Sequence, residues 1–292
     1  MKILHRLFAG LALLLSLGAA AQEADNQAQL KQFMDSLHYR EGTVAISGAH
    51  ATVNLNSDFR FLDAHDAQRV LHDLWGNPPD EDVLGMLVPR AASLTDEDNS
   101  WVVVVTYSSD GHVADTDAGS IDYDKMLKEM KESEKEVNAE REKQGYPAVE
   151  LVGWAAPPHY DAASNKLYWA KELAFRGGKE HTLNYDIRVL GRGGYLSLNA
   201  VAGMHQLAMV RDKMPDVLAM TEFDSGQRYS DFDASTDKVA AYGIGALVAG
   251  AIAAKAGLFA KLFVLLLAFK KFVIVGVVAV AAAVRKFFTR AR

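Results

Sequence analysis

The chain of 292 residues contains no cysteine, and this absence excludes several kinds of site at once. Disulfide bonds, thiolate nucleophiles, cysteine-ligated zinc and lipid attachment at an N-terminal cysteine all require that side chain. The sequence is therefore typical neither of a disulfide scaffold nor of a lipoprotein. It also shows no repeat of fixed period and no low-complexity tract.

Acidic residues are absent from the end of the chain, between Leu258 and Arg292, where seven basic residues stand. The net charge of the whole chain is nevertheless −6, so the body that precedes this basic end is clearly acidic. Proteins that bind nucleic acid neutralise phosphates with lysine and arginine. The charge distribution therefore argues against a nucleic-acid partner.

The first 21 residues are typical of a signal peptide. A short basic region at residues 2–6 is followed by an apolar stretch of signal-peptide length. The small residues Ala19 and Ala21 predict cleavage after Ala21. An uncleaved anchor helix is the alternative, although the apolar stretch is short for a membrane span. We expect an exported bacterial envelope protein in which residues 22–230 form a periplasmic domain.

The distribution of apolar residues predicts an α+β fold for this domain. Helical periodicity predicts helices, and β-branched apolar runs between turn residues predict strands. Helices are expected over residues 26–38, 63–76 and 121–144. A hairpin is expected around Ser47-Gly48, a buried strand in SWVVVVTY, and a four-strand antiparallel meander over residues 149–202. The predicted architecture is an antiparallel β-sheet with helices packed on it, followed by C-terminal transmembrane helices.

Four finer expectations concern the ends and edges of these elements. The short apolar run at residues 83–89 is expected to be an edge strand. Pro157 and Pro158 are expected in the turn that follows the first meander strand. A helix over residues 204–220 is expected to be interrupted near Pro215. The second half of the highly charged helix at 121–144 is expected to project into solvent, because its apolar residues lie in the first half.

Two segments carry candidate site residues. In PPHYD, residues 157–161, His159 and Asp161 could pair, and a histidine–carboxylate pair is a component of many catalytic sites. Tyr160 lies between them, and Arg228 and Tyr229 belong to the polar, aromatic segment 223–233. No serine stands in a nucleophile-elbow context, however, and a rigid loop between strands explains PPHYD equally well. These five residues are therefore candidates for a surface site rather than for a catalytic centre.

Neither a metal ion nor a cofactor is expected. His65 and His72 share a helix face but lie about 10 Å apart by helical rise, too far to bind one metal ion. DFDASTD, from Asp231 to Asp237, resembles half of a calcium loop, but Thr236 and Tyr242 replace the required glycine and glutamate. GRGGY at residues 191–195 joins two predicted strands, which indicates a hairpin turn rather than a phosphate loop.

The chain from residue 239 to 288 is almost entirely apolar and predicts a membrane anchor after an acidic linker at 231–238. Its stretches 239–254 and 262–284 are each close to the ~20 residues that a span needs. One span would leave every basic residue in the cytoplasm, including the basic tail at 289–292. Two spans would place Lys270 and Lys271 near the middle of the membrane. Both topologies remain open. The small residues Gly243 and Gly250 favour close helix–helix contacts.

Three segments together resemble one bacterial family: LVGWAAPPHYDAASNKLYWAKEL, LNYDIRVLGRGGYLSLNAVA and FDSGQRYSDFDASTDKVAAYGIGALVAG. The family is a group of predicted membrane-anchored envelope proteins that is catalogued only as a domain of unknown function. The resemblance covers nearly the whole mature chain and implies an exported α+β domain held by a C-terminal anchor. It implies no catalytic residue and no ligand, so it assigns no role to Trp154, His159 or Tyr229.

The main functional hypothesis is a non-enzymatic interaction or accessory protein, anchored in the bacterial inner membrane with its soluble domain in the periplasm. Its expected partners are membrane lipid and a membrane or periplasmic protein, or a second copy of the chain. The alternative is a membrane-tethered hydrolase or small-ligand receptor that uses segments 157–161 and 223–233. A weaker alternative is a transporter subunit in which Lys270 or Lys271 contributes to a charged pathway.

Overall fold

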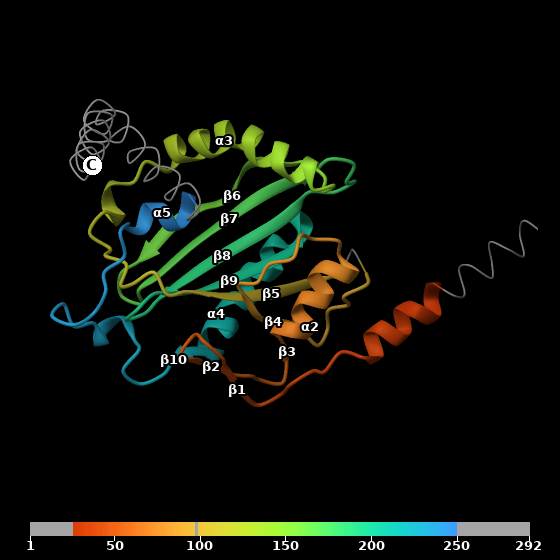
Figure 1. The fold of residues 1–292 in the computed structure, drawn as a ribbon, viewed down its shortest axis with the longest axis horizontal. Helices are drawn as coiled ribbons and strands as arrows, with labels where there is room; N and C mark the ends of the chain where they lie inside the picture. The colour runs from red at the N-terminus through yellow and green to blue at the C-terminus, as the bar shows by residue number, and fades with distance from the viewer. Residues whose placement is uncertain (1–25, 97–98, 250–292) are drawn as a thin grey trace, which may run out of the picture.

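The computed structural model describes residues 26–96 and 99–249, which form an α+β fold with two antiparallel β-sheets (Figure 1). The larger sheet has seven strands in the order β3-β4-β5-β9-β8-β7-β6. Their bounds are β3 Phe59–Asp63, β4 Val83–Pro89, β5 Trp101–Ser108, β6 Val149–Asp161, β7 Lys166–Phe175, β8 Thr182–Leu190 and β9 Tyr195–Gly203. The smaller sheet has the order β1-β2-β10, with bounds β1 Thr43–Ile46, β2 Ala51–Asn54 and β10 Thr221–Phe223. The predicted α+β class is confirmed.

The four-strand meander is present as β6 to β9, but its first turn lies further along the chain than predicted. Pro157 and Pro158 belong to β6, which continues to Asp161. Within a sheet, proline is tolerated on an edge strand, where its missing N–H costs no ladder bond. β6 is the edge strand, and its register with β7 shifts between Ala156 and His159, next to the two prolines.

The expectation that residues 83–89 form an edge strand was wrong, because β4 pairs with β3 on one side and β5 on the other. The short segment FRFLD, which we did not recognise as a strand, forms β3 and takes the edge position. Gly85 makes this pairing possible. A Cβ atom at Gly85 would lie 2.1 Å from the ring of Phe61, so a side chain there would displace a buried aromatic ring.

One face of the large sheet is covered by α4, Leu207–Met220, and by the small sheet. Val210, Met214 and Val217 of α4 are buried in one core with Ile187 and Leu198 of the large sheet. The predicted interruption at Pro215 was wrong, since α4 runs through it. A proline inside a helix costs about 3 kcal/mol. Fully burying a side chain such as Met or Val contributes about 1.5–3 kcal/mol, so the packing of Met214 and Val217 is sufficient to offset that cost.

The other face of the sheet is covered by two separate helical groups. Over β3–β5 lie a helix at residues 26–35, α2 (Ala64–Arg69) and the π-helical turn η1 (Val70–Leu74) that continues α2. Over β6–β8 lie α3 (Tyr123–Lys143), which runs along β6, and α5 (Ile244–Ala249). Short 3-10 turns complete the structure: η2 (Ala118–Ser120), η3 (Met204–Gln206) and η4 (Tyr229–Asp231). In Figure 1, the middle of β7, β8 and β9 is visible between the two helical groups.

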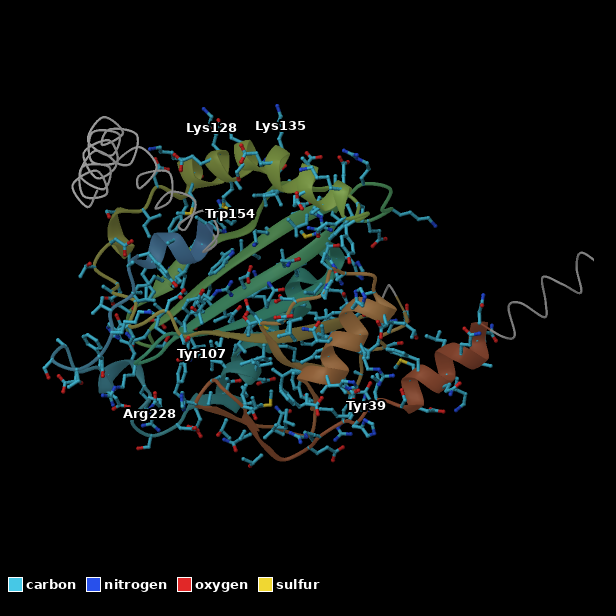
Figure 2. All side chains as sticks on the ribbon, viewed as in Figure 1. Tyr39, Tyr107, Lys128, Lys135, Trp154 and Arg228 are labelled. Carbon is cyan, nitrogen blue, oxygen red and sulfur yellow. The ribbon has the colours of Figure 1, made fainter. Side chains whose placement is uncertain are left out.

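The second half of α3 does not project into solvent, so this expectation was wrong. It lies along the edge strand β6 and bonds to the backbone of that strand. Asn138 donates to the carbonyl of Val149 and accepts from its N–H, both at 2.8 Å. Glu134 accepts from the Leu151 N–H at 2.7 Å. Lys128 and Lys135 point away from the sheet on the outer side of α3 (Figure 2).

No helix in residues 26–96 and 99–249 is long and apolar enough to cross a membrane. Four predicted features lie outside the described residues: the signal peptide at 1–21, Gly250, the stretch 262–284 with Lys270 and Lys271, and the tail at 289–292.

The α3–β6 contact predicts a measurable contribution of Asn138 to stability. We expect Asn138→Ala to lower the free energy of unfolding by about 1–3 kcal/mol, because it leaves both polar groups of Val149 without their partner. The matched control Lys135→Ala, on the outer side of α3, should change stability by less than about 0.5 kcal/mol. Urea unfolding of both variants checks this, and equal effects would show that α3 does not protect the β6 edge.

Candidate functional site

Two of the five predicted site residues, Tyr160 and Tyr229, meet at the segment between β5 and α3. The Tyr160 hydroxyl donates to Asp115 Oδ2 at 2.8 Å, and the Tyr229 hydroxyl donates to the Val113 carbonyl at 3.0 Å. Burial raises the pKa of Tyr229 to about 12. Burial and the neighbouring Asp115 raise the pKa of Tyr160 further. Both phenols therefore stay protonated at neutral pH, so they act here as hydrogen-bond donors rather than as bases.

The other three predicted residues do not join them. His159 is exposed on the edge strand. The carboxylate of Asp161 accepts bonds from the Ala163 N–H and the Ser164 hydroxyl, so it stabilises the β6–β7 turn rather than orienting His159. Arg228 is exposed, and its backbone N–H donates to Asp231 at 2.9 Å (Figure 2). The five residues thus form no common site.

His112, which we did not predict, is sealed between two aromatic rings. The ring centroids of Tyr229 and Phe232 lie 4.2 Å and 3.8 Å from that of His112. The backbone of His112 bonds to that of Lys238 and Ala240, at 2.8 Å each. Burial lowers the pKa of His112, although Asp115 and Asp237 act in the opposite direction. This arrangement attaches the acidic stretch 231–238 to the body of the protein.

Gly243, predicted as a membrane-helix contact, lies at the start of α5 against Asp117. The Asp117 carboxylate accepts bonds from the N–H groups of Ile244 and Gly245 at 3.0 Å and 3.2 Å. A Cβ atom at Gly243 would lie 2.5 Å from that carboxylate. In the described part of the chain, Gly243 therefore lets a distant aspartate cap α5.

Asp63, His65 and Asp66 place donor atoms within 4.8 Å of one another, as a metal site would require. The buried Asp66, however, already accepts bonds from His65, Arg69 and the side chain and backbone of His38. Burial alone would raise the pKa of Asp66, but these donors outweigh it and lower the pKa to about 2. Asp66 therefore links α2 to the segment that follows the N-terminal helix through these hydrogen bonds.

A strip of polar side chains crosses the sheet face between the two helical groups. Asp186 of β8 is 3% exposed, and it lies between Lys171 of β7 and Arg188 two residues further along β8. Arg188 Nη1 lies 3.1 Å from Asp186 Oδ1. Lys171 Nζ lies 3.4 Å from Oδ2, an ion-pair distance without hydrogen-bond geometry. Burial would raise the pKa of Asp186, but Lys171 and Arg188 overcome this and lower it.

Three neutral polar residues complete this strip, which we call the polar strip: Lys171, Asn184, Asp186, Arg188, Ser197 and Asn199. Asn184 donates to Asn199 at 3.3 Å, and Asn199 donates to Asp186 at 2.8 Å. Arg188 also donates to the Ser197 hydroxyl at 2.5 Å. The register pairs Asn184 with Lys171, Asp186 with Asn199 and Arg188 with Ser197, which places all six side chains on one face.

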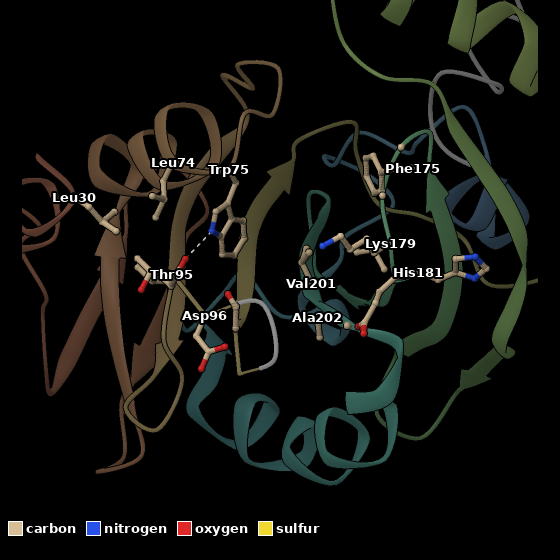
Figure 3. Close-up of a pocket in the computed structure, with 17 residues that line it drawn as sticks. Leu30, Leu74, Trp75, Thr95, Asp96, Phe175, Lys179, His181, Val201 and Ala202 are labelled. Atoms are coloured by element: carbon tan, nitrogen blue, oxygen red, sulfur yellow. Dashed lines mark hydrogen bonds between the residues drawn. The ribbon is translucent and has the colours of Figure 1, made fainter. Parts of the chain in front are cut away.

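A groove of about 710 Å³ adjoins the polar strip. Trp75 stands on one side of this groove and Phe175 and Lys179 on the other, with Val201 between them (Figure 3). Val201 lies directly opposite Asn184 in the sheet, so the groove and the polar strip meet at this pair. The volume lies within the range of ~300–1,000 Å³ typical of small-molecule sites. The groove and the polar strip together are the candidate functional site.

Sequence reasoning missed this site, although the sequence holds one signal of it. In TLNYDIRVL and YLSLNAVA, polar residues recur at every second position inside strands whose other residues are apolar. Such alternation places them on one face of the sheet. Only the register shows that Asp186 has two cations as neighbours and that Asn184 borders the groove.

Asp186 is predicted to contribute more to the free energy of unfolding than an exposed aspartate does. Asp186→Asn should lower the free energy of unfolding by about 3 kcal/mol, because Lys171 and Arg188 lose the carboxylate between them. The control Asp212→Asn, at a side chain that is 78% exposed, should cost less than about 0.5 kcal/mol. Denaturant unfolding at pH 7 compares the two variants. A cost for Asp186→Asn as small as that of the control would contradict the assignment.

His112 is predicted to make stability depend on pH. Because its pKa is lowered in the fold, the unfolded chain binds a proton more readily than the folded chain once the pH falls below about 6.5. The free energy of unfolding should therefore be highest above that pH. Below it, the titration of this group should lower the free energy of unfolding by at most about 1.4 kcal/mol per pH unit. Unfolding of the wild type and of His112→Gln at pH 8 and pH 5 checks this. The decline should be smaller in the variant, and an equal decline would rule His112 out.

Comparisons with known proteins identify a family and several distant structural likenesses. No curated protein matches the chain by sequence. PsbP (CyanoP) of the cyanobacterium Synechocystis is 13% identical, with a TM-score of 0.35 over 62% of this chain and 91% of that one. The Ran-binding protein Mog1p of Saccharomyces cerevisiae is 12% identical, with a TM-score of 0.32 over 68% of this chain and all of that one. These TM-scores are too low to support any argument. A family model described as a protein of unknown function, DUF2167, matches residues 38–281, and the chain therefore belongs to this family.

Proposed function

We propose that this protein is a non-enzymatic accessory protein of the bacterial envelope, with its folded body in the periplasm and its C-terminal stretch in the inner membrane. The observation that carries this proposal is the way the body joins that stretch. Ile244, Leu247 and Val248 of α5 are at most 3% exposed and belong to one core with Leu167 and Trp169 of the sheet. The chain therefore enters its apolar C-terminal part from a packed helix.

Such a junction suits a body that must keep a fixed orientation to a membrane. Three contacts hold it: the Asp117 cap of α5, the stacked His112, and the bidentate pair of Arg192 and Asp237 at 2.7 Å and 2.9 Å. With this attachment, the membrane would position the sheet for a second molecule. We propose that this partner is a membrane or periplasmic protein, or a second copy of the chain.

Residues in and beside the predicted site segments give this accessory role further support. Tyr160 and Tyr229 are protonated donors, and His112 is sealed by stacking. Asp161 is engaged in a turn. None of these groups is held as an activated base or nucleophile. The hydrolase alternative based on segments 157–161 and 223–233 therefore has no arrangement of described residues in its favour.

Anchoring predicts where the protein is found after cell fractionation. The full chain should remain with inner membranes after a carbonate wash. A chain that ends at Ala249, where the described part of α5 ends, should be released with the periplasmic fraction. The signal peptide should be absent from both, with Gln22 as the first residue on N-terminal sequencing. A full chain released by carbonate, or a truncated chain that stays with the membrane, would overturn the anchor.

The accessory role predicts a stable partner. Crosslinking of the membrane-bound chain, followed by mild-detergent purification, should retain one additional protein or a dimer of the chain. As a matched test of the junction, Asp117→Ala should weaken the association, because it removes the cap of α5. Asp124→Ala, in the first turn of α3, serves as the control. Recovery of the monomer alone would count against the role.

A second candidate function, a small-ligand receptor, is favoured by the groove and the polar strip. The residues that line this groove belong to neither of the two segments singled out in the sequence. A receptor role would therefore use the groove between η1 and the β7–β8 turn, and not the two predicted segments.

A further inference from the structure

The polar strip contains more positive than negative charge. Lys171 and Arg188 both face Asp186, so two cations share one carboxylate. The side chains of Lys171 and Arg188 are only 23% and 16% exposed, so solvent screens them poorly. A partly buried cation whose charge is not fully balanced raises the free energy of the folded state. This favours the binding of an additional anion at this place.

Two buried donors in the same place lack acceptors. Trp169 is 1% exposed, and its Nε1–H has no hydrogen-bond partner. Arg188 Nε is likewise buried and unpartnered, while its guanidinium lies 4.8 Å above the Trp169 ring. Lys171 and Asp186 form an ion pair at 3.4 Å, and Asp186 Oδ2 accepts no hydrogen bond. Unpartnered buried donors are rare in native proteins. Together with the excess of positive charge, these two donors favour an acceptor with negative charge at this place.

Asp186 sets the direction of the hydrogen bonds in the strip, because its carboxylate can only accept them. Its Oδ1 accepts from Arg188 and from Asn199, and Asn199 in turn accepts from Asn184. Both asparagine amides are thus oriented by one buried carboxylate. Asn184 has a second N–H on its amide nitrogen. It lies directly opposite Lys171 in the sheet, so the two can donate to one group.

The groove supplies an apolar wall next to these donors. Val201 and Thr182 line the groove, and both are neighbours of Asn184: Val201 across the sheet, and Thr182 two residues earlier on β8. Trp75 and Phe175 stand beyond them on the two sides (Figure 3). A molecule with one charged end and an apolar body would therefore place both parts in matching surroundings.

We propose that the protein binds a small amphiphilic molecule with an oxyanion head group, a carboxylate or a phosphate ester, at this site. The head group accepts hydrogen bonds from Lys171 and Asn184 and balances the excess charge of Arg188. The apolar part lies in the groove between Trp75 and Phe175. This inference deepens the receptor function and does not rest on the membrane anchor.

The test is calorimetric titration of the purified full chain with four probes. Hexanoate and hexyl phosphate combine a six-carbon body with the two head groups. Hexanol has the body without the charge, and acetate has the charge without the body. We expect at least one of the first two to bind saturably with one site per chain, at least about tenfold more tightly than hexanol or acetate.

Two variants and a matched control locate the binding. Lys171→Gln should weaken binding of the anionic probe about tenfold or more, and Lys135→Gln on the outer side of α3 should leave it unchanged. Asn184→Asp places a carboxylate directly opposite Lys171. It should preserve or raise the melting temperature through an added ion pair and yet abolish anion binding. This variant keeps the test valid even if Lys171→Gln fails to fold.

Each result decides the proposal. Carboxylate binding and phosphate binding identify which head group the site takes, and either supports it. Absence of saturable binding by both anionic probes overturns it, as does binding that Asn184→Asp and Lys171→Gln leave unchanged. Binding of hexanol as tight as that of hexanoate would also overturn it, because the charge of the strip would then have no role. Loss of the membrane anchor in fractionation would leave these outcomes unaffected.

Discussion

The carboxylate of Asp186, buried in the middle of the large sheet, is the constraint on which much of the structure depends. A carboxylate at 3% exposure needs compensating charge and donors, and Lys171, Arg188 and Asn199 provide them from the same sheet face. An apolar helix cannot cover such a strip without burying further unpaired polar groups. The helices therefore pack on either side, which explains why this face has two cores rather than one.

The same division shapes the candidate site. Because α2 and η1 cover only the β3–β5 side, Trp75 faces the β7–β8 turn across an open groove. Val201 lines that groove and lies directly opposite Asn184, at the end of the polar strip. The opposite face has one continuous core under α4 and the small sheet, which provides the rigid support that a binding surface requires. The candidate site thus lies on the face opposite this continuous core.

The borders of the sheet depend on polar contacts that substitute for a missing strand. Along β6, Asn138 and Glu134 of α3 bond to backbone groups that an eighth strand would otherwise pair. Beyond this region, Pro157 and Pro158 remove donors from the edge. At the C-terminal side, Asp117, His112 and the Arg192–Asp237 pair attach residues 231–249 to the body. These contacts make α5 part of the folded body in an accessory protein of the kind proposed.

The sequence by itself determined the class of the fold and most of its elements. Apolar periodicity and turn residues are local, so the meander, the hairpin β1–β2 and the helix starting at Asp63 could be predicted from short segments. Whether a residue ends an element depends on what packs against it. Burial of Met214 and Val217 therefore carries α4 through Pro215, and the edge position of β6 admits its two prolines. The candidate site likewise depended on tertiary structure. Two partners of Asp186, Lys171 and Asn199, come from β7 and β9, and the groove joins residues as distant in sequence as Trp75 and Val201. Distances between such residues are fixed by strand register and helix packing, which no local pattern encodes.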